Sequence, residues 1–261
     1  MTAFTPHPVA TGSVPVRLLH GVLADHHLWD AVVTRVPDLA AVALDMPGHG
    51  SAPRLDPLPD LDGLVDALAA ELAAGPPAVL AGHSWGGMLA LRLAVRHPDR
   101  VRGLLLCNTP LEPAPRAGFR AQRALLAAGL PPRTYGRIAA GALYGRTHLV
   151  AHPEVRTATA ATAAGLGRRG TRDVLRRVLL EPGDAVGLLR RVVVPVVLLA
   201  GTQDYVASPA LRARVARTGH DLRLVPGGHT SPAEAPAEVA AALAELVGRV
   251  GTTRTGATLP G

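Results

Sequence analysis

The sequence contains no lysine, and all 27 of its Lys and Arg positions are arginine. A Walker-type phosphate-binding loop needs a lysine, and no Gly-x-Gly-x-x-Gly turn follows the first expected strand, so we expect no nucleotide cofactor. The single cysteine, Cys107, excludes an internal disulfide and a cysteine-based zinc site. The histidines, including the neighbours His26 and His27, lack the His-Glu-x-x-His spacing of a metal-ligand pair. Neither a metal nor any other cofactor is therefore expected.

Aromatic residues and long apolar runs are also scarce. The chain has two Phe, three Tyr and two Trp, and no basic stretch is interleaved with aromatic residues, so nucleic-acid binding is not expected despite a formal net charge of +7. The longest apolar run, residues 192–200, has the length of a strand, which excludes a membrane-spanning helix. The first residues, 1–16, lack the basic start and apolar stretch of a secretory signal. Together with the lone cysteine, this favours a cytoplasmic protein.

The chain does contain an alternation of short apolar runs and longer amphipathic segments. The expected strands are 14–20, 40–45, 78–82, 101–107, 192–200 and 222–225. The expected helices are 27–36, 58–74, 85–97, 209–217 and 236–247. This alternation is typical of a parallel sheet covered by helices on both faces, and 261 residues suffice for one such domain.

The alternation is interrupted in the middle of the chain. From about Pro110 to Arg191 there are helical stretches but no convincing strand, which indicates a helical insertion between two strands of the sheet. The sequence therefore predicts a core domain of residues 1–110 and 191–250 with an inserted helical region of residues 111–190. The last residues, 251–261, are rich in Gly and Thr without periodicity, so we expect a disordered tail.

The strongest chemical signal is the segment Gly82-His83-Ser84-Trp85-Gly86, which matches Gly-x-Ser-x-Gly between an expected strand and an expected helix. The chain must turn from strand to helix within a few residues, which places the serine in a strained conformation and exposes its hydroxyl. Side chains at Gly82 and Gly86 would collide with the neighbouring elements. We therefore predict that Ser84 is a nucleophile.

A serine nucleophile needs a base and a group that orients the base, and in this type of fold both follow the serine in the chain. Asp204 lies in the loop after the strand 192–200, and His229 lies in the loop after the strand 222–225. The carboxyl ends of parallel strands share one edge of the sheet, so we predict that the two side chains meet Ser84 there. The alternative position for the acid, one strand earlier, falls near Asn108, which is not a carboxylate.

Acyl transfer also needs backbone N–H donors for the oxyanion. One predicted donor is the amide of Trp85, which directly follows the nucleophile, and the other is the amide of Val22, in the loop after the first main strand. His20 and Gly21 precede Val22, so we expect them to shape this loop and to border the substrate. A direct catalytic role for His20 is a further option.

Taken in order, these motifs resemble the α/β-hydrolase superfamily over roughly residues 14–110 and 190–248. The segments that carry the resemblance are Leu19-His20-Gly21, Trp29, Asp45 to Ser51, Gly82 to Gly87, Asp204 and Gly228-His229. The resemblance implies an α/β-hydrolase fold with a mostly parallel sheet. It also implies that Asp45 caps a strand end and that His49 is a candidate for lining the pocket. The N-terminal segment is too short for a well-defined leading hairpin, so we expect a sheet trimmed at that edge.

The insertion resembles the lid of this superfamily, which implies that it covers Ser84 and influences substrate choice. Its Tyr135 and Tyr144 are candidate substrate-binding residues. From Arg116 to Arg191 the chain has fourteen arginines and four acidic residues. Two interpretations remain open, a solvated surface in an arginine-rich protein or a docking face for an acidic partner such as an acyl carrier protein.

Three functions are consistent with these motifs. The first is hydrolysis of a small-molecule ester, thioester or lactone through a serine-bound acyl group. The second is a non-hydrolytic reaction with the same triad, such as lyase chemistry, carbon–carbon bond cleavage or acyl transfer; the loop from Asp45 to Ser51 is similar to that of a menaquinone-pathway synthase of the superfamily. The third is a non-catalytic ligand binder, which would have no need for a complete triad. The fold alone does not select a substrate.

Overall fold

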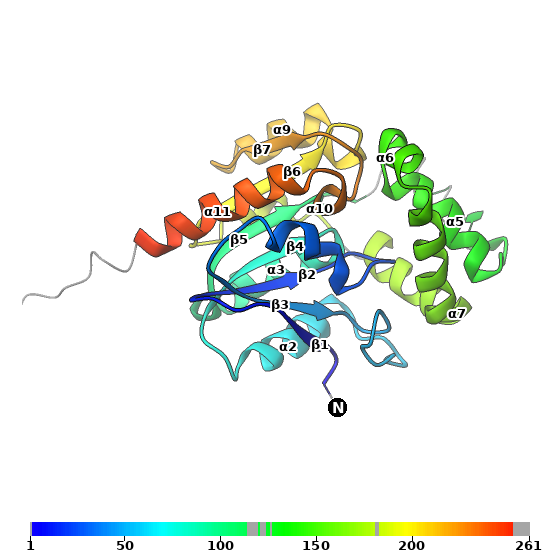
Figure 1. Ribbon diagram of the computed structural model, residues 1–261, viewed down its shortest axis with the longest axis horizontal. Helices are drawn as coiled ribbons and strands as arrows, with labels where there is room; N and C mark the ends of the chain where they lie inside the picture. Colours follow the sequence, from blue (N-terminus) through cyan, green and yellow to red (C-terminus); the bar gives the residue numbers. More distant parts are fainter. Residues whose placement is uncertain (1, 114–119, 121–123, 126, 181–182, 253–261) are drawn as a thin grey trace, which may run out of the picture.

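The computed structural model describes residues 2–252 except for 114–119, 121–123, 126 and 181–182. Within these residues the chain forms one seven-stranded sheet in the order β1-β3-β2-β4-β5-β6-β7 (Figure 1). Its strands are β1 (Thr5–Ala10), β2 (Val14–Leu19), β3 (Leu39–Asp45), β4 (Ala78–His83), β5 (Val101–Cys107), β6 (Val196–Gly201) and β7 (Leu222–Val225). β1 is antiparallel to β3, and the other neighbouring pairs are parallel. The mostly parallel α/β sheet predicted from the sequence is confirmed.

The N-terminal edge of the sheet differs from the expectation in one respect. The segment before β2 forms the strand β1, which pairs with β3 rather than forming a hairpin with β2. Two prolines, Pro6 and Pro8, concealed this strand in the sequence because proline cannot donate to a strand ladder. An edge strand tolerates proline because one of its sides has no neighbour to bond to, and β1 occupies such an edge.

Outside the insertion, the helical elements range from single turns to the 17 residues of α11. They are η1 (His26–Trp29), α1 (Asp30–Val33), α2 (Leu61–Leu72), α3 (Trp85–Arg96), η2 (Pro98–Arg100), η3 (Tyr205–Ala207), α9 (Pro209–Ala216), α10 (Ser231–Glu234) and α11 (Pro236–Thr252). The predicted helix 27–36 is therefore a 3-10 turn followed by a single α-helical turn. The predicted tail, 251–261, lies outside the described residues from 253 onward, and α11 continues to Thr252.

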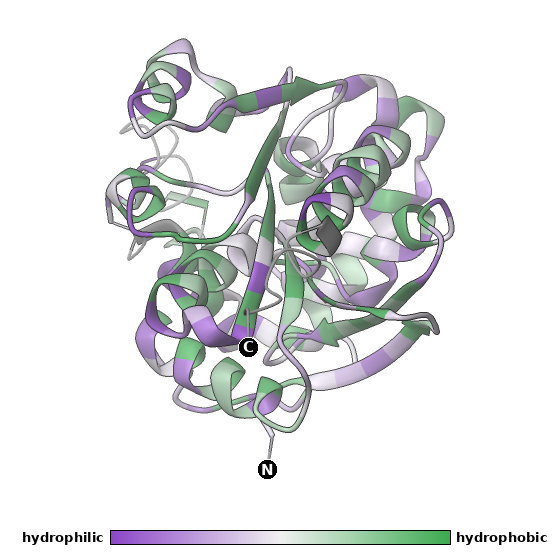
Figure 2. Cartoon of the chain, turned by 90° about the vertical axis from the view of Figure 1, so that its left-hand side faces the viewer, coloured by the Kyte–Doolittle hydropathy of each residue, from purple (hydrophilic) through white to green (hydrophobic). Residues whose placement is uncertain are grey.

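The core consists of two apolar layers because consecutive strand residues point to opposite faces of the sheet. In β5, Leu104 and Leu106 contact the layer beneath α2, α3, α8 and α9, whereas Leu105 and Cys107 contact the layer beneath α1 and α11. Figure 2 shows the strands as mainly hydrophobic and the helices as mixed. Both layers hold the carboxyl ends of β4, β6 and β7 rigidly at one edge of the sheet.

The described elements between β5 and β6 are helical. They are α5 (Pro132–Leu143), α6 (Arg146–Ala151), α7 (Glu154–Leu180) and α8 (Val186–Leu189). α5 and α7 pack closely where Gly136 faces the backbone of Ala160, and α7 is kinked at Gly167, whose φ is 66°. In Figure 1, α5, α6 and α7 lie together beyond one end of the sheet. None of the described helices combines the length and apolar character needed to span a bilayer.

Candidate active site

Ser84 occupies the turn between β4 and α3, and its backbone has φ 51° and ψ −113°. A non-glycine residue rarely adopts a positive φ, and such a conformation costs about 1–3 kcal/mol. The turn is possible because its glycines leave no side chains in the way. A Cβ on Gly86 would press on the carbonyl oxygen of Leu19, and a Cβ on Gly82 would lie 2.6 Å from the Cα of Gly87. Close packing on both sides of Ser84 therefore keeps its backbone in this strained conformation.

The structure brings Ser84, His229 and Asp204 together from three separate loops. The Oγ of Ser84 lies 2.9 Å from Nε2 of His229, and Nδ1 of His229 lies 2.9 Å from Oδ2 of Asp204. The loop after β7 carries His229 back toward Ser84 through Gly227, whose φ of 105° is accessible mainly to glycine. All three side chains are buried, with exposed fractions of 5% for Ser84, 5% for His229 and 8% for Asp204. This arrangement can move a proton from the hydroxyl to the imidazole.

The carboxylate of Asp204 has donors beyond His229. Nδ2 of Asn108 donates to Oδ2 at 2.7 Å, and the amide of Val206 donates to Oδ1 at 3.2 Å. Burial would raise the pKa of Asp204, but the charge of His229 and the hydrogen bonds from His229, Asn108 and Val206 outweigh it and keep that pKa below its ordinary value. The carboxylate therefore remains charged and is able to stabilise a protonated imidazole.

In the sequence, Asn108 marks only the alternative position for the acid, where no carboxylate is present. The structure shows that its side chain holds the acid of the neighbouring loop. It also donates to the carbonyl of Gly228 at 3.1 Å and accepts from the amide of Ser231 at 3.2 Å. Its signal in the sequence is that it is the only asparagine and directly follows β5, which lies between β4 and β6. Its φ of 51° also suits asparagine better than most residues.

The predicted oxyanion loop, residues 20–23, passes close to Ser84. A Cβ on Gly21 would lie 3.1 Å from the Cβ of Ser84 and 2.5 Å from Nδ1 of His83, so only glycine fits there. Among the described residues, no acceptor takes the amide protons of Val22 or Trp85. The amide of Trp85 is free because it begins α3, where the first N–H groups have no partner within the helix. Two N–H donors near Ser84 are thus available to a bound oxygen.

Comparisons with known proteins show the family of this chain. The sequence profile of the alpha/beta hydrolase family matches residues 18–242, which is most of the chain. This chain belongs to the alpha/beta hydrolase family. It is 34% identical to a pimeloyl-[acyl-carrier protein] methyl ester esterase of Neisseria meningitidis, over 80% of this chain and 83% of that protein. It is 30% identical to the lipase LipV of Mycobacterium tuberculosis, over 91% of this chain and 95% of that protein.

Among solved structures, this hydrolase is similar to a thermophilic esterase from Thermogutta terrifontis. The TM-score is 0.79 with 25% identity, and the match covers 95% of this chain and 93% of that one. It also matches an enol-lactonase from Burkholderia xenovorans with a TM-score of 0.75 and 18% identity, over 95% of this chain and 96% of that one. The second likeness concerns the fold alone.

In this hydrolase His20 supports the oxyanion loop from beneath. It is fully buried, its Nδ1 donates to the carbonyl of Gly21 at 2.7 Å, and its Nε2 accepts from the amide of Met46 at 2.9 Å. Burial and the nearby His49 together lower the pKa of His20 to about 3. The ring is therefore neutral, and neither nitrogen is free for a substrate. These contacts place His20 in the framework of the loop that it was expected to shape, whereas its position at the border of the substrate stays a prediction.

His49, predicted as a candidate for lining the pocket, is likewise fully buried and bonded to backbone. Its Nδ1 donates to the carbonyl of Pro47 at 3.1 Å, and its Nε2 accepts from the amide of Leu23 at 3.2 Å. Burial lowers the pKa of His49 to about 4. Leu23 directly follows Val22 and has a φ of 62°, so His49 holds the far end of the oxyanion loop.

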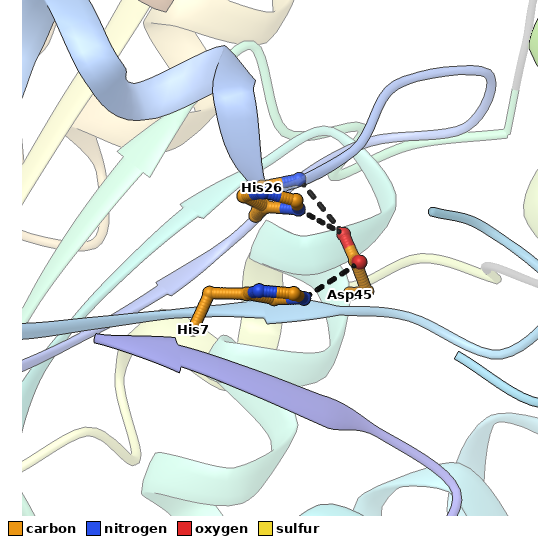
Figure 3. A group of neighbouring side chains, drawn as sticks. All are labelled: His7, His26 and Asp45. Carbon is orange, nitrogen blue, oxygen red and sulfur yellow. Dashed lines mark hydrogen bonds and ion pairs between the residues drawn. The ribbon is translucent and has the colours of Figure 1, made fainter. Parts of the chain in front are cut away.

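Asp45, at the end of β3, links the edge strand to the residues that follow the oxyanion loop. Its carboxylate lies 2.9 Å from Nε2 of His7 and 2.9 Å from Nδ1 of His26, and it accepts from the amide of His26 (Figure 3). It also accepts from the amide of Ser51. The possible metal-ligand atoms of His7, His26 and Asp45 lie within 4.8 Å of one another, so these are the described residues best placed to hold a metal ion. However, the two rings are stacked 3.7 Å apart at 9°, and nitrogens of parallel rings do not converge on one ion. The group acts here as a hydrogen-bonded connection between β1, η1 and β3.

The two predicted tyrosines of the insertion occupy different surroundings. Tyr135, on α5, is buried in the apolar layer that the insertion shares with α2 and α3. Tyr144 directly follows α5 and lies beside the His229 loop, and its ring stacks 5.5 Å from that of His148. Burial and the negative charge of Glu234 raise the pKa of Tyr144 to about 12. Tyr144 is thus near the triad, whereas Tyr135 belongs to the interior of the insertion.

Proposed function

We propose that this protein hydrolyses a small-molecule carboxylic ester, thioester or lactone through an acyl group carried on Ser84. The observation that carries the proposal is the continuous relay from Oγ of Ser84 through the imidazole of His229 to the carboxylate of Asp204, with 2.9 Å at both steps. Relatives named as a methyl ester esterase and a lipase support ester hydrolysis as the reaction.

In the proposed mechanism, Nε2 of His229 takes the hydroxyl proton as Oγ of Ser84 attacks the carbonyl carbon. The imidazolium is stabilised by Asp204, and the developing oxyanion accepts from the amides of Val22 and Trp85. His229 then passes the proton to the leaving group, which breaks the ester bond and leaves the acyl group on Ser84. Water, deprotonated by His229, attacks this acyl group and restores the free hydroxyl.

The test is covalent labelling of Ser84 by a fluorophosphonate, combined with a series of acyl esters and thioesters of increasing chain length. The wild-type protein is expected to be labelled at Ser84 and to hydrolyse part of the series. Ser84→Ala is expected to lose the label and the turnover. A folded wild-type protein that never reacts with the probe would refute the proposal.

The same experiment separates the rival functions. Rapid labelling with negligible hydrolysis of every ester would favour a non-hydrolytic reaction such as acyl transfer or lyase chemistry. Ligand affinity that survives in Ser84→Ala, without turnover in wild type, would instead identify a binding protein on this fold.

We further propose that residues 111–190 act as a lid over Ser84 and that an acyl carrier protein docks on its arginine-rich surface. The exposed arginines of the described insertion include Arg133, Arg137 and Arg172. The related protein of Neisseria meningitidis is named for an ester of such a carrier, which supports this partner. Acidic carriers would be attracted to a cationic face, most strongly at low ionic strength.

The docking surface can be tested with a double variant, Arg133→Glu with Arg137→Glu. At low salt, its kcat/KM for a carrier-linked ester is expected to fall about tenfold or more, whereas its kcat/KM for the free methyl ester is unchanged. Arg212→Glu, which reverses an exposed arginine on α9, is the control. Equal kcat/KM values of the double variant and the control on the carrier-linked ester would contradict docking on this surface.

A further inference from the structure

Glu234, the last residue of α10, joins the loop of His229 to the insertion. Its Oε2 accepts from the amide of Gly145 at 2.7 Å and from the amide of Gly228 at 2.9 Å. Its Oε1 accepts from the amide of Thr230 at 3.0 Å. One carboxylate therefore binds the amides of Gly228 and Thr230, on either side of His229, and that of Gly145, two residues beyond α5.

A second set of contacts joins the same two segments without Glu234. The carbonyl of Leu143, at the end of α5, accepts from the amide of His229 at 2.9 Å and from the hydroxyl of Thr230 at 2.9 Å. The backbones also approach closely, since a Cβ on Gly228 would lie 2.5 Å from the amide nitrogen of Gly145. The end of α5 and the loop of His229 are thus packed backbone against backbone.

The chemistry of these contacts requires a carboxylate. Three N–H groups converge on two oxygens, and an ionised carboxylate has acceptor sites for all of them. Charge-assisted hydrogen bonds are also stronger than neutral ones. A glutamine would offer one oxygen, and its amide nitrogen would face one of the N–H groups, which would leave that group without an acceptor.

We propose that Glu234 is a positioning residue that fixes the imidazole of His229 relative to Ser84 and couples this position to the attached end of the insertion. The inference rests on the proposed function, because it assigns Glu234 a role in the reaction of Ser84. Glu234 acts through the backbone of Gly228 and Thr230 and does not contact the reacting atoms. Leu143 and Gly145 are hydrogen-bonded to the loop of His229 directly and through Glu234. Movement of the insertion at this end would therefore pull on that loop and displace the imidazole of His229.

The test compares Glu234→Gln with Glu238→Gln, the same change at an exposed position four residues later on α11. The rate constant for fluorophosphonate labelling of Ser84 and the kcat and KM for a p-nitrophenyl ester are measured well below the unfolding temperature. In Glu234→Gln the labelling rate constant and kcat are expected to fall about tenfold, with KM within about twofold, because misplacement of the base by a fraction of an ångström lowers the rate of the chemical step. Glu238→Gln is expected to match wild type.

Two further measurements distinguish a misplaced base from poor folding of Glu234→Gln. Thr230→Val removes only the hydroxyl that donates to Leu143, and it is expected to slow labelling about threefold. Limited trypsin digestion is expected to cut after Arg146 faster in Glu234→Gln than in wild type, because the carboxylate no longer holds Gly145. This readout does not depend on catalysis.

The two proposals fail in different ways. If wild type is labelled at Ser84 and folded Glu234→Gln is labelled at the same rate, Glu234 has no positioning role and the proposed function stands. A loss of rate that only follows the loss of folded protein would also overturn the positioning role. If wild type itself is never labelled, the proposed function fails and the inference fails with it.

Discussion

Asn108 offers the sharpest test of how the triad is held. Replacing it with alanine removes three hydrogen bonds, namely the donor to Asp204 at 2.7 Å, the donor to the carbonyl of Gly228 at 3.1 Å and the acceptor for the amide of Ser231 at 3.2 Å. The side chain is fully buried, so water cannot readily replace these partners. The carboxylate of Asp204 keeps only His229 and the amide of Val206 as donors.

The magnitudes follow from the kind of bond that is lost. A hydrogen bond to a charged group contributes about 1.5–3 kcal/mol, and each neutral bond contributes about 1 kcal/mol. We therefore expect Asn108→Ala to lower the free energy of unfolding by roughly 3–5 kcal/mol. If the bond to Asp204 stabilises the transition state by this full amount, its loss lowers kcat about 10- to 150-fold. KM should change little, because Asn108 is fully buried and its side chain bonds to Asp204, Gly228 and Ser231.

A glycine at the same position separates hydrogen bonding from backbone strain. Asn108 has a φ of 51°, which glycine adopts freely and alanine does not. Asn108→Gly should therefore be about 1 kcal/mol more stable than Asn108→Ala but equally slow. The assays are urea unfolding and steady-state hydrolysis of a p-nitrophenyl ester. A folded Asn108→Ala protein with kcat within about twofold of wild type would show that Asp204 does not depend on this side chain.

Three further predictions concern stability. Because the pKa values of His20 and His49 are lowered to about 3 and about 4, the folded protein binds fewer protons below pH 6.5 than the unfolded chain does. The free energy of unfolding should therefore fall by up to about 1.4 kcal/mol per pH unit for each histidine as the pH drops from 6.5 toward 4. A urea midpoint that stays constant from pH 7.5 to 5 would contradict this. Gly86→Ala should cost more than about 2 kcal/mol in thermal unfolding because its Cβ meets a backbone carbonyl, whereas Gly248→Ala, which meets nothing within 4 Å on α11, should gain up to about 1 kcal/mol. Asp45→Asn should cost roughly 3 kcal/mol, measured by urea unfolding, because the charged acceptor of several hydrogen bonds is lost; an unchanged midpoint would show that the group around Asp45 contributes little.

Features that depend on neighbouring positions along the chain could be predicted from the sequence. The strands β5 and β7 have the predicted bounds because each is a short apolar run between turn residues. The turn around Ser84 was recognisable because Gly82 and Gly86 mark the close approach of strand and helix. The order of Ser84, Asp204 and His229, each one loop beyond a strand, predicts that they meet at one edge of the sheet.

Features that depend on contacts between distant segments needed the tertiary structure. β1 contains two prolines and is a strand only because the free side of β3 accepts it. The histidines 20 and 49 are indistinguishable from pocket residues in the sequence, and only their backbone partners show that they support a loop. Glu234 resembles any acid near the end of a short helix until Gly145, 89 residues away, is seen to donate to it.

The sequence by itself determined the fold class and predicted the sharp turn that carries Ser84, because periodicity and glycine-rich turns act over a few residues. Only the tertiary structure decided the distances of 2.9 Å on both sides of His229 and the side chains that maintain them. Hydrogen bonding depends on separations of a few tenths of an ångström, and such separations arise when loops from different strands pack against one another.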